Sequence, residues 1–166
     1  MRRIVLSLVV GLAFVGSASA QAEGGPTCNV AGPFINYYGN PLLPKINVLS
    51  GNFTMGQNTQ LRLEAGLGFI EGFACLVLQE DTDNLQFIAQ VPGVTGDLYL
   101  CVSRPMFIIY EGQLLGGLNA GNSPIRTINF PFDPAFCGFR LGFQGYVTTE
   151  IFTNPTFTQY TVGVAH

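Results

Sequence analysis

Apolar and polar residues alternate with a period of two in several short stretches of the chain. The clearest stretch covers residues 59–67. Leu61 and Leu63 fall on one of its faces, and Arg62 lies on the other. Such alternation is typical of a β-strand with one buried side and one side facing solvent. The nearly continuous apolar run at 73–79 instead predicts a strand in the middle of a sheet.

Further strand patterns follow at short intervals, separated by turns rich in Gly, Pro, Asn and Asp. Outside the first twenty residues, no stretch of twelve free of Gly and Pro has a helical apolar period. The sequence therefore predicts an all-β fold of about eight or nine strands, an antiparallel, jelly-roll-like β-sandwich. The strands are expected at 45–49, 59–67, 73–79, 85–91, 97–103, 106–110, 125–130, 136–147 and 157–164.

The first twenty residues have the pattern of a secretory signal peptide. Arg2 and Arg3 precede an apolar run at 4–15, and small residues at 17–20 form an A-x-A cleavage site. The run is too short for a membrane-spanning helix, which needs about 20 apolar residues. We expect a signal peptide at 1–20, an extended Pro- and Gly-rich segment at 21–44 and a sandwich domain at 45–166.

Charge is sparse and mostly negative. Removal of the first twenty residues leaves five basic side chains against ten acidic ones, a net charge of −5. Nucleic-acid binding is disfavoured because it depends on clustered Lys and Arg. Charged residues make up 10% of the chain, well below the roughly 25% of a typical soluble domain. A weakly charged surface suits adhesion or self-association, although an ordinary extracellular sandwich with polar strand faces has the same composition.

Four cysteines follow the leader, and an even number in an exported chain predicts two disulfides. They are Cys28, Cys75, Cys101 and Cys137. Their spacing contains no C-x-x-C pair, so a structural zinc site is not expected. Spacing alone leaves all three connectivities open.

The sequence offers no recognisable catalytic constellation. It lacks a G-x-S-x-G motif, and its single histidine is the last residue, His166, where we expect a frayed end. Acidic residues that could pair as in glycosidases are scattered, and solvated surface charges explain them better. These are Glu64, Glu71, Glu80, Glu111 and Glu150. We expect no enzyme activity and no cofactor.

Two binding chemistries deserve comparison with simpler explanations. Asp81, Asp83 and Asn84 place oxygen ligands in one turn, a weak calcium candidate that is otherwise a polar hairpin turn. Six tyrosines and a Gly-rich loop at 111–124 are a candidate sugar-binding surface, although tyrosines at the rim of the core would look the same. The tyrosines are Tyr37, Tyr38, Tyr99, Tyr110, Tyr146 and Tyr160.

Residues 128–144 (INFPFDPAFCGFRLGFQ) resemble the pattern I-P-x-D-P-x-L-x-G-x-x-L-x-F-Q. That pattern is found in a small, largely uncharacterised exported domain common in planctomycete-like and other Gram-negative surface proteins. The resemblance implies a β-sandwich at the cell envelope or outside the cell, and no known activity. It also suggests that one bridge joins Cys28 to Cys101, which leaves Cys75 to pair with Cys137.

Together these features predict a secreted or cell-surface, non-enzymatic β-sandwich with a structural, adhesive or self-associating role. Its partners would be copies of itself, another surface protein or glycans, and not nucleic acid. The alternative is an extracellular carbohydrate-binding module.

Overall fold

The computed structural model describes Cys28 and residues 30–81, 89–101 and 103–166. The expected signal peptide lies outside these residues and stays a prediction. Within the described part of the chain, no helix is long and apolar enough to span a bilayer.

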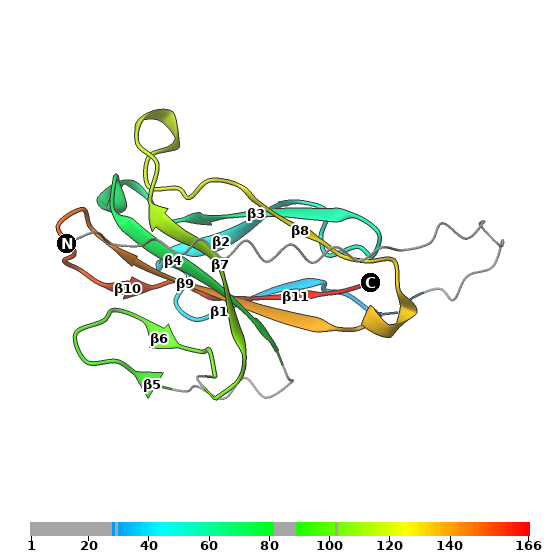
Figure 1. Cartoon of the computed structure of the whole chain (residues 1–166). Helices are drawn as coiled ribbons and strands as arrows, with labels where there is room; N and C mark the ends of the chain where they lie inside the picture. The colour runs from blue at the N-terminus through cyan, green and yellow to red at the C-terminus, as the bar shows by residue number, and fades with distance from the viewer. Residues whose placement is uncertain (1–27, 29, 82–88, 102) are drawn as a thin grey trace, which may run out of the picture.

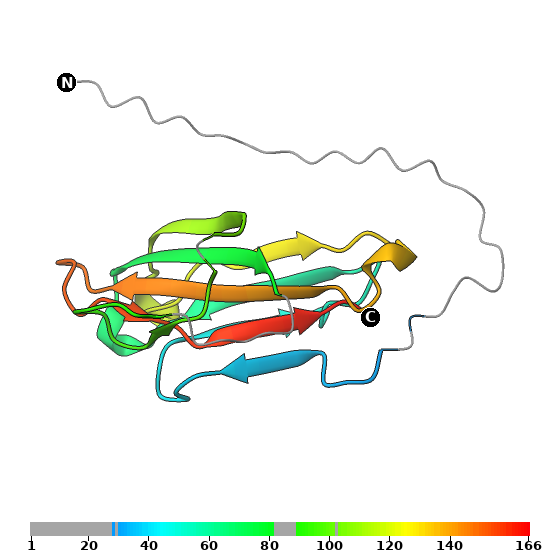
Figure 2. The same ribbon diagram turned by 90° about the horizontal axis from the view of Figure 1, so that it is seen from below.

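The described residues form an all-β fold of eleven strands, and every paired strand is antiparallel to its neighbour (Figure 1). The larger sheet has six strands, of which five lie side by side in Figure 2. Their order is β1 (Ile35–Tyr38), β11 (Tyr160–Val164), β9 (Arg140–Thr148), β4 (Phe73–Glu80) and β7 (Met106–Gln113), and β10 (Thr156–Phe157) also pairs with β9.

A three-stranded sheet and a small hairpin complete the architecture. The second sheet has the order β2 (Lys45–Ser50), β3 (Asn58–Glu64) and β8 (Arg126–Asn129), and the hairpin joins β5 (Ala89–Gln90) to β6 (Asp97–Leu98). Three 3₁₀ turns lie in the connections: η1 (Leu67–Phe69), η2 (Gly117–Asn119) and η3 (Pro134–Phe136). The predicted β-sandwich is thus confirmed.

The main core lies between the two larger sheets. Leu61 and Leu63 of β3 are fully buried while Arg62 is not, which confirms the predicted alternation. Phe53 fills the centre, and its ring lies 5.5 Å from that of Phe143 in β9. Gly163 of β11 makes room for it, because a Cβ there would come within 2.4 Å of the Phe53 ring.

A second, smaller core covers the opposite face of the six-stranded sheet. Segment 89–101 lies over this face, where Tyr99 stacks on Tyr160 with ring centroids 5.6 Å apart. Gln144 is buried here, although glutamine is a residue type found mostly at the surface. Its Oε1 accepts a bond from Tyr99 N (2.9 Å), and its Nε2 donates to Asp97 O (2.7 Å) and Thr158 O (3.1 Å).

Gln79 of β4 holds the same segment in a similar way. Its side chain both donates to Cys101 O and accepts from Cys101 N, each at 2.8 Å. Among the described residues of the strand expected at 97–103, only the two of β6 are in a strand. Side-chain amides satisfy backbone groups that a neighbouring strand would otherwise pair.

The segment before residue 45 belongs in part to the sandwich. Its β1 pairs with β11, so the expected boundary at 44/45 does not separate it from the domain. The last residue is also held in place: the His166 ring stacks on Phe34 at 3.5 Å, and its Nε2 lies 3.3 Å from Thr54 Oγ1. The expectation of a frayed end at His166 is therefore wrong.

Strand ends differ from the prediction where local turns intervene. β9 begins at Arg140 and not at 136, because Asp133 caps η3 by accepting a bond from Ala135 N at 2.9 Å. The expected strand at 157–164 is split into β10 and β11, and the strand expected at 106–110 continues to Gln113.

The disulfide pairing suggested by the family resemblance is wrong. Cys28 is bonded to Cys137, with a Cα–Cα distance of 5.5 Å. Both ends of this bridge lie beside Ala165, whose carbonyl is 3.9 Å from Cys28 Sγ and accepts a bond from Gly138 N at 2.9 Å.

Cys75 and Cys101 are free thiols. Cys101 is held by Gln79, which lies four residues beyond Cys75 on β4. The rise of a strand puts these positions about 13 Å apart. A disulfide requires Cα atoms within about 7 Å. The two thiols therefore do not form the second bridge that an even cysteine count suggested.

Candidate functional site: an apolar groove beside an edge strand

The most unusual surface of the described chain surrounds β7. This strand is the last in its sheet, so one of its edges pairs with no described strand. Its first three residues are Met106, Phe107 and Ile108, and all are exposed; the exposed fractions of Phe107 and Ile108 are 62% and 61%. Unpaired, apolar edge strands readily pair with another chain.

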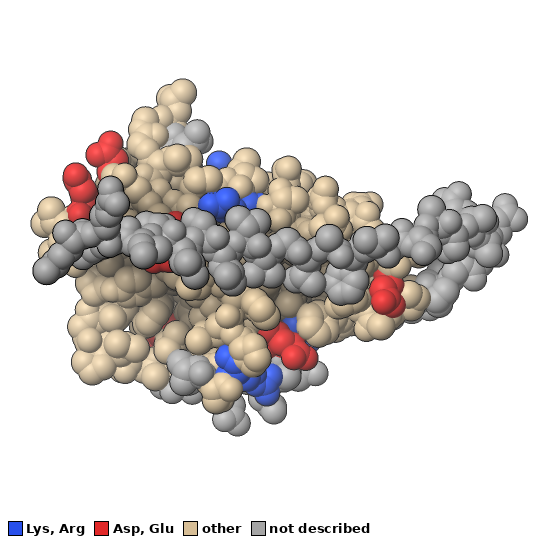
Figure 3. Space-filling view, in the orientation of Figure 1, with Lys and Arg blue, Asp and Glu red and all other residues tan. Residues whose placement is uncertain are grey.

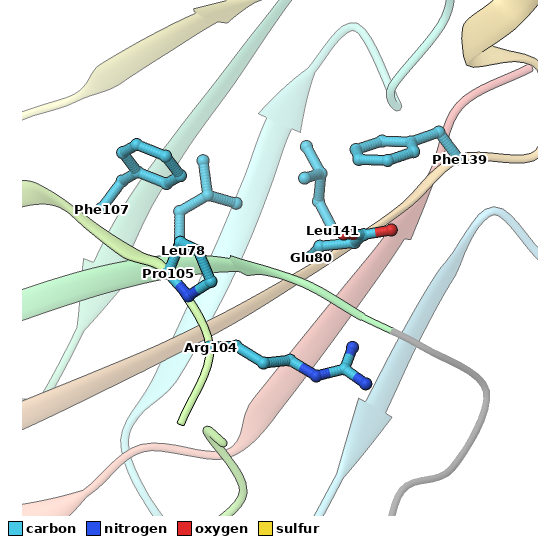
Figure 4. A pocket seen from close by; sticks show the side chains of 7 residues that line it. All are labelled: Leu78, Glu80, Arg104, Pro105, Phe107, Phe139 and Leu141. Atoms are coloured by element: carbon cyan, nitrogen blue, oxygen red, sulfur yellow. The ribbon is translucent and has the colours of Figure 1, made fainter. Parts of the chain in front are cut away.

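A groove lies beside this edge where the smaller sheet does not cover β4 and β9 (Figure 4). Its cavity volume is about 640 Å³. Leu78 is the cross-strand partner of Phe107, so both side chains lie on the same face of the sheet. The groove is lined by Leu78, Glu80, Arg104, Pro105, Phe107, Phe139 and Leu141.

A bulge gives β7 this arrangement. The pairing of β4 with β7 shifts between Leu76 and Val77, so that Tyr110 pairs with Leu76 but Ile108 pairs with Val77. Ile109 is the extra residue. As a result, Tyr110 is buried in the core while Phe107 lines the open groove. A bulge of this kind commonly re-aims the side chains of an edge strand.

Charged residues lie near the two ends of β7, and its central residues are apolar. Arg104 lies two residues before β7, and Glu111 is the only charged residue within it. The strand contains no Lys or Pro, residues that commonly protect an edge from pairing. The surrounding surface is also weakly charged: Figure 3 shows few acidic or basic side chains on the visible face.

The loop after β7 carries another exposed apolar residue. The loop after β7 projects from the sheets (Figure 1), and Leu118, in its 3₁₀ turn η2, is fully exposed. Backbone bonds tie the base of the loop together, from Leu115 N to Asn122 O (2.8 Å) and from Gly121 N to Leu115 O (2.9 Å). Leu118 is therefore presented by an ordered base.

Asp81, one of the calcium candidates, already has protein partners. Its Oδ2 lies 2.8 Å from Arg140 Nη2, and its Oδ1 accepts a hydrogen bond from the Tyr160 hydroxyl at 2.9 Å. Burial and the Asp81 carboxylate raise the pKa of Tyr160 well above its ordinary value. Asp83 and Asn84 lie outside the described residues. Among the residues that are described, no group of three His, Cys, Asp or Glu side chains is placed to hold a metal ion.

The structure separates the remaining candidate residues. Only Tyr37 and Tyr146 are exposed among the six tyrosines, and they lie on β1 and β9, which are not adjacent. Glu64, Glu80 and Glu111 line three different pockets. Glu64 also forms an ion pair with Arg62, with 2.8 Å between Nη2 and Oε1. Burial alone would raise the pKa of Glu64, but hydrogen bonds from Asn47 and Arg62 outweigh this effect and lower it.

The two free thiols have different surroundings. Burial, together with the nearby Glu111 carboxylate, raises the pKa of Cys75. Hydrogen bonds from Ser103, whose Oγ lies 3.0 Å from Cys101 Sγ, lower the pKa of Cys101. Cys101 is therefore the thiol that ionises more readily.

No family model, curated protein or solved structure matches this chain. The resemblance of residues 128–144 to an exported domain stays a prediction. Any functional conclusion therefore depends on the geometry of the chain itself.

Proposed function

We propose that this chain is an exported, non-enzymatic contact protein that self-associates through β7. One observation carries the proposal: an edge strand, with no described partner on its outer side, exposes three consecutive apolar side chains beside an apolar groove. Covering Met106, Phe107 and Ile108 would remove apolar area from water, and each side chain fully buried contributes about 1.5–3 kcal/mol. Pairing would also satisfy the free backbone groups of β7.

The charge pattern of β7 favours a second copy as the partner. In an antiparallel β7–β7 pair related by a two-fold axis, the apolar centres meet each other. Arg104 of each copy then approaches the end of the opposite strand that carries Glu111. A parallel pair would place like charges together, which is unfavourable. The surface is thus complementary to itself, as a two-fold interface requires.

Other observations support the non-enzymatic and exported parts of the proposal. His166 is held in packing and hydrogen bonds, and the carboxylates are spread over separate pockets. The Cys28–Cys137 disulfide is compatible with an oxidising compartment. The proposed role is therefore contact between copies at or outside the cell envelope.

Sedimentation velocity over a range of protein concentrations tests self-association. We expect the wild-type sedimentation coefficient to rise with concentration, and Ile108→Lys to weaken association by roughly tenfold or more, because burying its charge in the interface is costly. Ile151→Lys is the matched control, since Ile151 is equally apolar and exposed but lies in the turn after β9. A strictly monomeric wild-type protein at high concentration would contradict the proposal, as would equal effects of the two substitutions.

A further inference from the structure

A second pocket lies on the other face of the six-stranded sheet, away from the groove. Glu111 of β7, Cys75 of β4 and Tyr146 of β9 are cross-strand partners in one row. Side chains in such a row share a face of the sheet. They line a cavity of about 250 Å³, which Phe73, Thr148 and Phe152 also line. This volume suits one small chemical group and is below that of a drug-sized site.

Three aromatic rings line this cavity, which we call the aromatic pocket. The Phe73 and Phe152 ring centroids are 5.8 Å apart, and Tyr146 is a third ring. Phe152 is largely exposed although its backbone has φ = +57°, a conformation unfavourable for a bulky side chain. Hydrogen bonds between Thr149 and Thr153 hold this turn. The turn thus fixes an exposed ring over the pocket at a cost in backbone energy.

Two polar groups of the pocket lack partners. The Thr148 side chain is only 3% exposed, and its Oγ1 has no hydrogen-bond partner in the structure. A buried hydroxyl normally has one. Glu111 forms no ion pair with any described residue. No Lys or Arg is among the described residues that line the pocket.

We propose that the aromatic pocket binds a primary alkylammonium group, as in a free amine or a lysine side chain. Aromatic faces attract cations, and the Glu111 carboxylate supplies the opposite charge. A primary ammonium group also has N–H donors, one of which can form a hydrogen bond to Thr148 Oγ1. A quaternary ammonium has no N–H group and cannot form this bond. A sugar ring fits less well, because its several hydroxyls would find few polar partners among these side chains.

This inference does not rest on the proposed self-association, although Glu111 takes part in both proposals. It uses the pocket face of β7 and not its free edge or the apolar groove. Amine binding is therefore expected even if the wild-type protein proves monomeric in sedimentation velocity. The two proposals can fail separately.

The test is a titration followed by ¹H–¹⁵N NMR at constant ionic strength. The ligands are n-butylammonium chloride, Nα-acetyl-lysine amide and, as the uncharged counterpart, 1-butanol. We expect saturable shifts of the amides of Cys75, Glu111, Tyr146 and Phe152 with both amines, and at least tenfold weaker binding of 1-butanol. A lower Kd for the lysine derivative would identify a peptide side chain as the better ligand, and a lower Kd for n-butylammonium a free amine.

Substitutions distinguish the pocket from the rest of the acidic surface. Glu111→Gln and Tyr146→Leu should each weaken amine binding at least fivefold, whereas Glu150→Gln, which removes a carboxylate outside the pocket lining, should leave it unchanged. Retained ¹H–¹⁵N dispersion will show that each variant is folded. Equal binding of 1-butanol, saturable shifts with glucose or N-acetylglucosamine in place of the amines, or insensitivity to Glu111→Gln would each overturn the proposal.

Discussion

Replacing Gln144 by leucine tests how the outer segment is held on the sheet. The side chain is buried and bonds to the backbone of Tyr99, Asp97 and Thr158. Leucine has a similar size but leaves one N–H and two carbonyl groups without this partner. Each buried group left unpaired costs about 1–3 kcal/mol. Two of the three contacts are only partly buried, so water relieves part of their cost.

We therefore expect Gln144→Leu to lower the free energy of unfolding by about 3 kcal/mol. For a chain of this length, that loss lowers Tm by roughly 6–12 °C. Urea unfolding followed by circular dichroism measures the change, with Gln60→Leu as the control. Gln60 is also a strand residue, but it is exposed and bonds only to Ser50 at 3.3 Å. Its substitution should change stability by less than about 0.5 kcal/mol.

Gln144→Glu provides an internal check on the direction of the effect. Protonated, the carboxylic acid can accept from Tyr99 N and donate to one of the two carbonyl oxygens; ionised, it has no donor for either of them. Burial will raise its folded-state pKa above the unfolded value of about 4.3. The acid therefore supports the fold fully below that value, and this support is lost as pH rises through the folded pKa. A loss below about 0.5 kcal/mol for Gln144→Leu would refute the reasoning. So would a Gln144→Glu variant whose stability relative to the wild type is greater at pH 7 than at pH 4.

Three further predictions follow from charges, titration and the disulfide. Arg104→Glu should weaken self-association severalfold, and adding Glu111→Arg should restore it in sedimentation velocity; no recovery in the double variant would argue against the antiparallel pairing. Because the pKa of Tyr160 is raised, its neutral form stabilises the fold below about pH 10, the ordinary tyrosine value, and this stability is lost as pH rises further. Tyr160→Phe should flatten that loss in unfolding measurements, and an unchanged slope above pH 10 would contradict it. The Cys28–Cys137 bond closes a loop with a sequence separation of 109 residues, so replacing both cysteines by serine should cost about 2–5 kcal/mol in urea unfolding; peptide mapping that finds either residue bonded elsewhere would refute the pairing.

The strands that local pattern determines were predicted well. In β3 the alternation of Leu61, Arg62 and Leu63 reports directly which side is buried. The apolar run of β4 reports a central position, which its pairing with β7 and β9 confirms. In both cases the pattern lies within the strand itself, so the local sequence is enough to predict which residues are buried.

Features that depend on distant contacts could not be predicted in the same way. Glutamine is a residue type found mostly at the surface, and only the segment at 97–101 makes Gln144 a buried residue. β1 lies among prolines and glycines, and its pairing with β11 joins the two ends of the described chain. The partner of Cys28 likewise depends on η3 placing Cys137 beside Ala165.

The candidate site also depends on strand order. Residues 106–110 predict a strand, but nothing local distinguishes an edge from a central position. The groove arises because β7 ends the larger sheet where the smaller one does not cover it.

Hydrogen exchange measured by mass spectrometry at low and high protein concentration tests the proposed contact most directly. Peptides covering β7 should exchange more slowly at high concentration, because pairing protects their free amides, while peptides covering β1 at the opposite edge of the sheet should not change. Equal exchange of β7 at both concentrations, or protection confined to β1, would contradict self-association through β7.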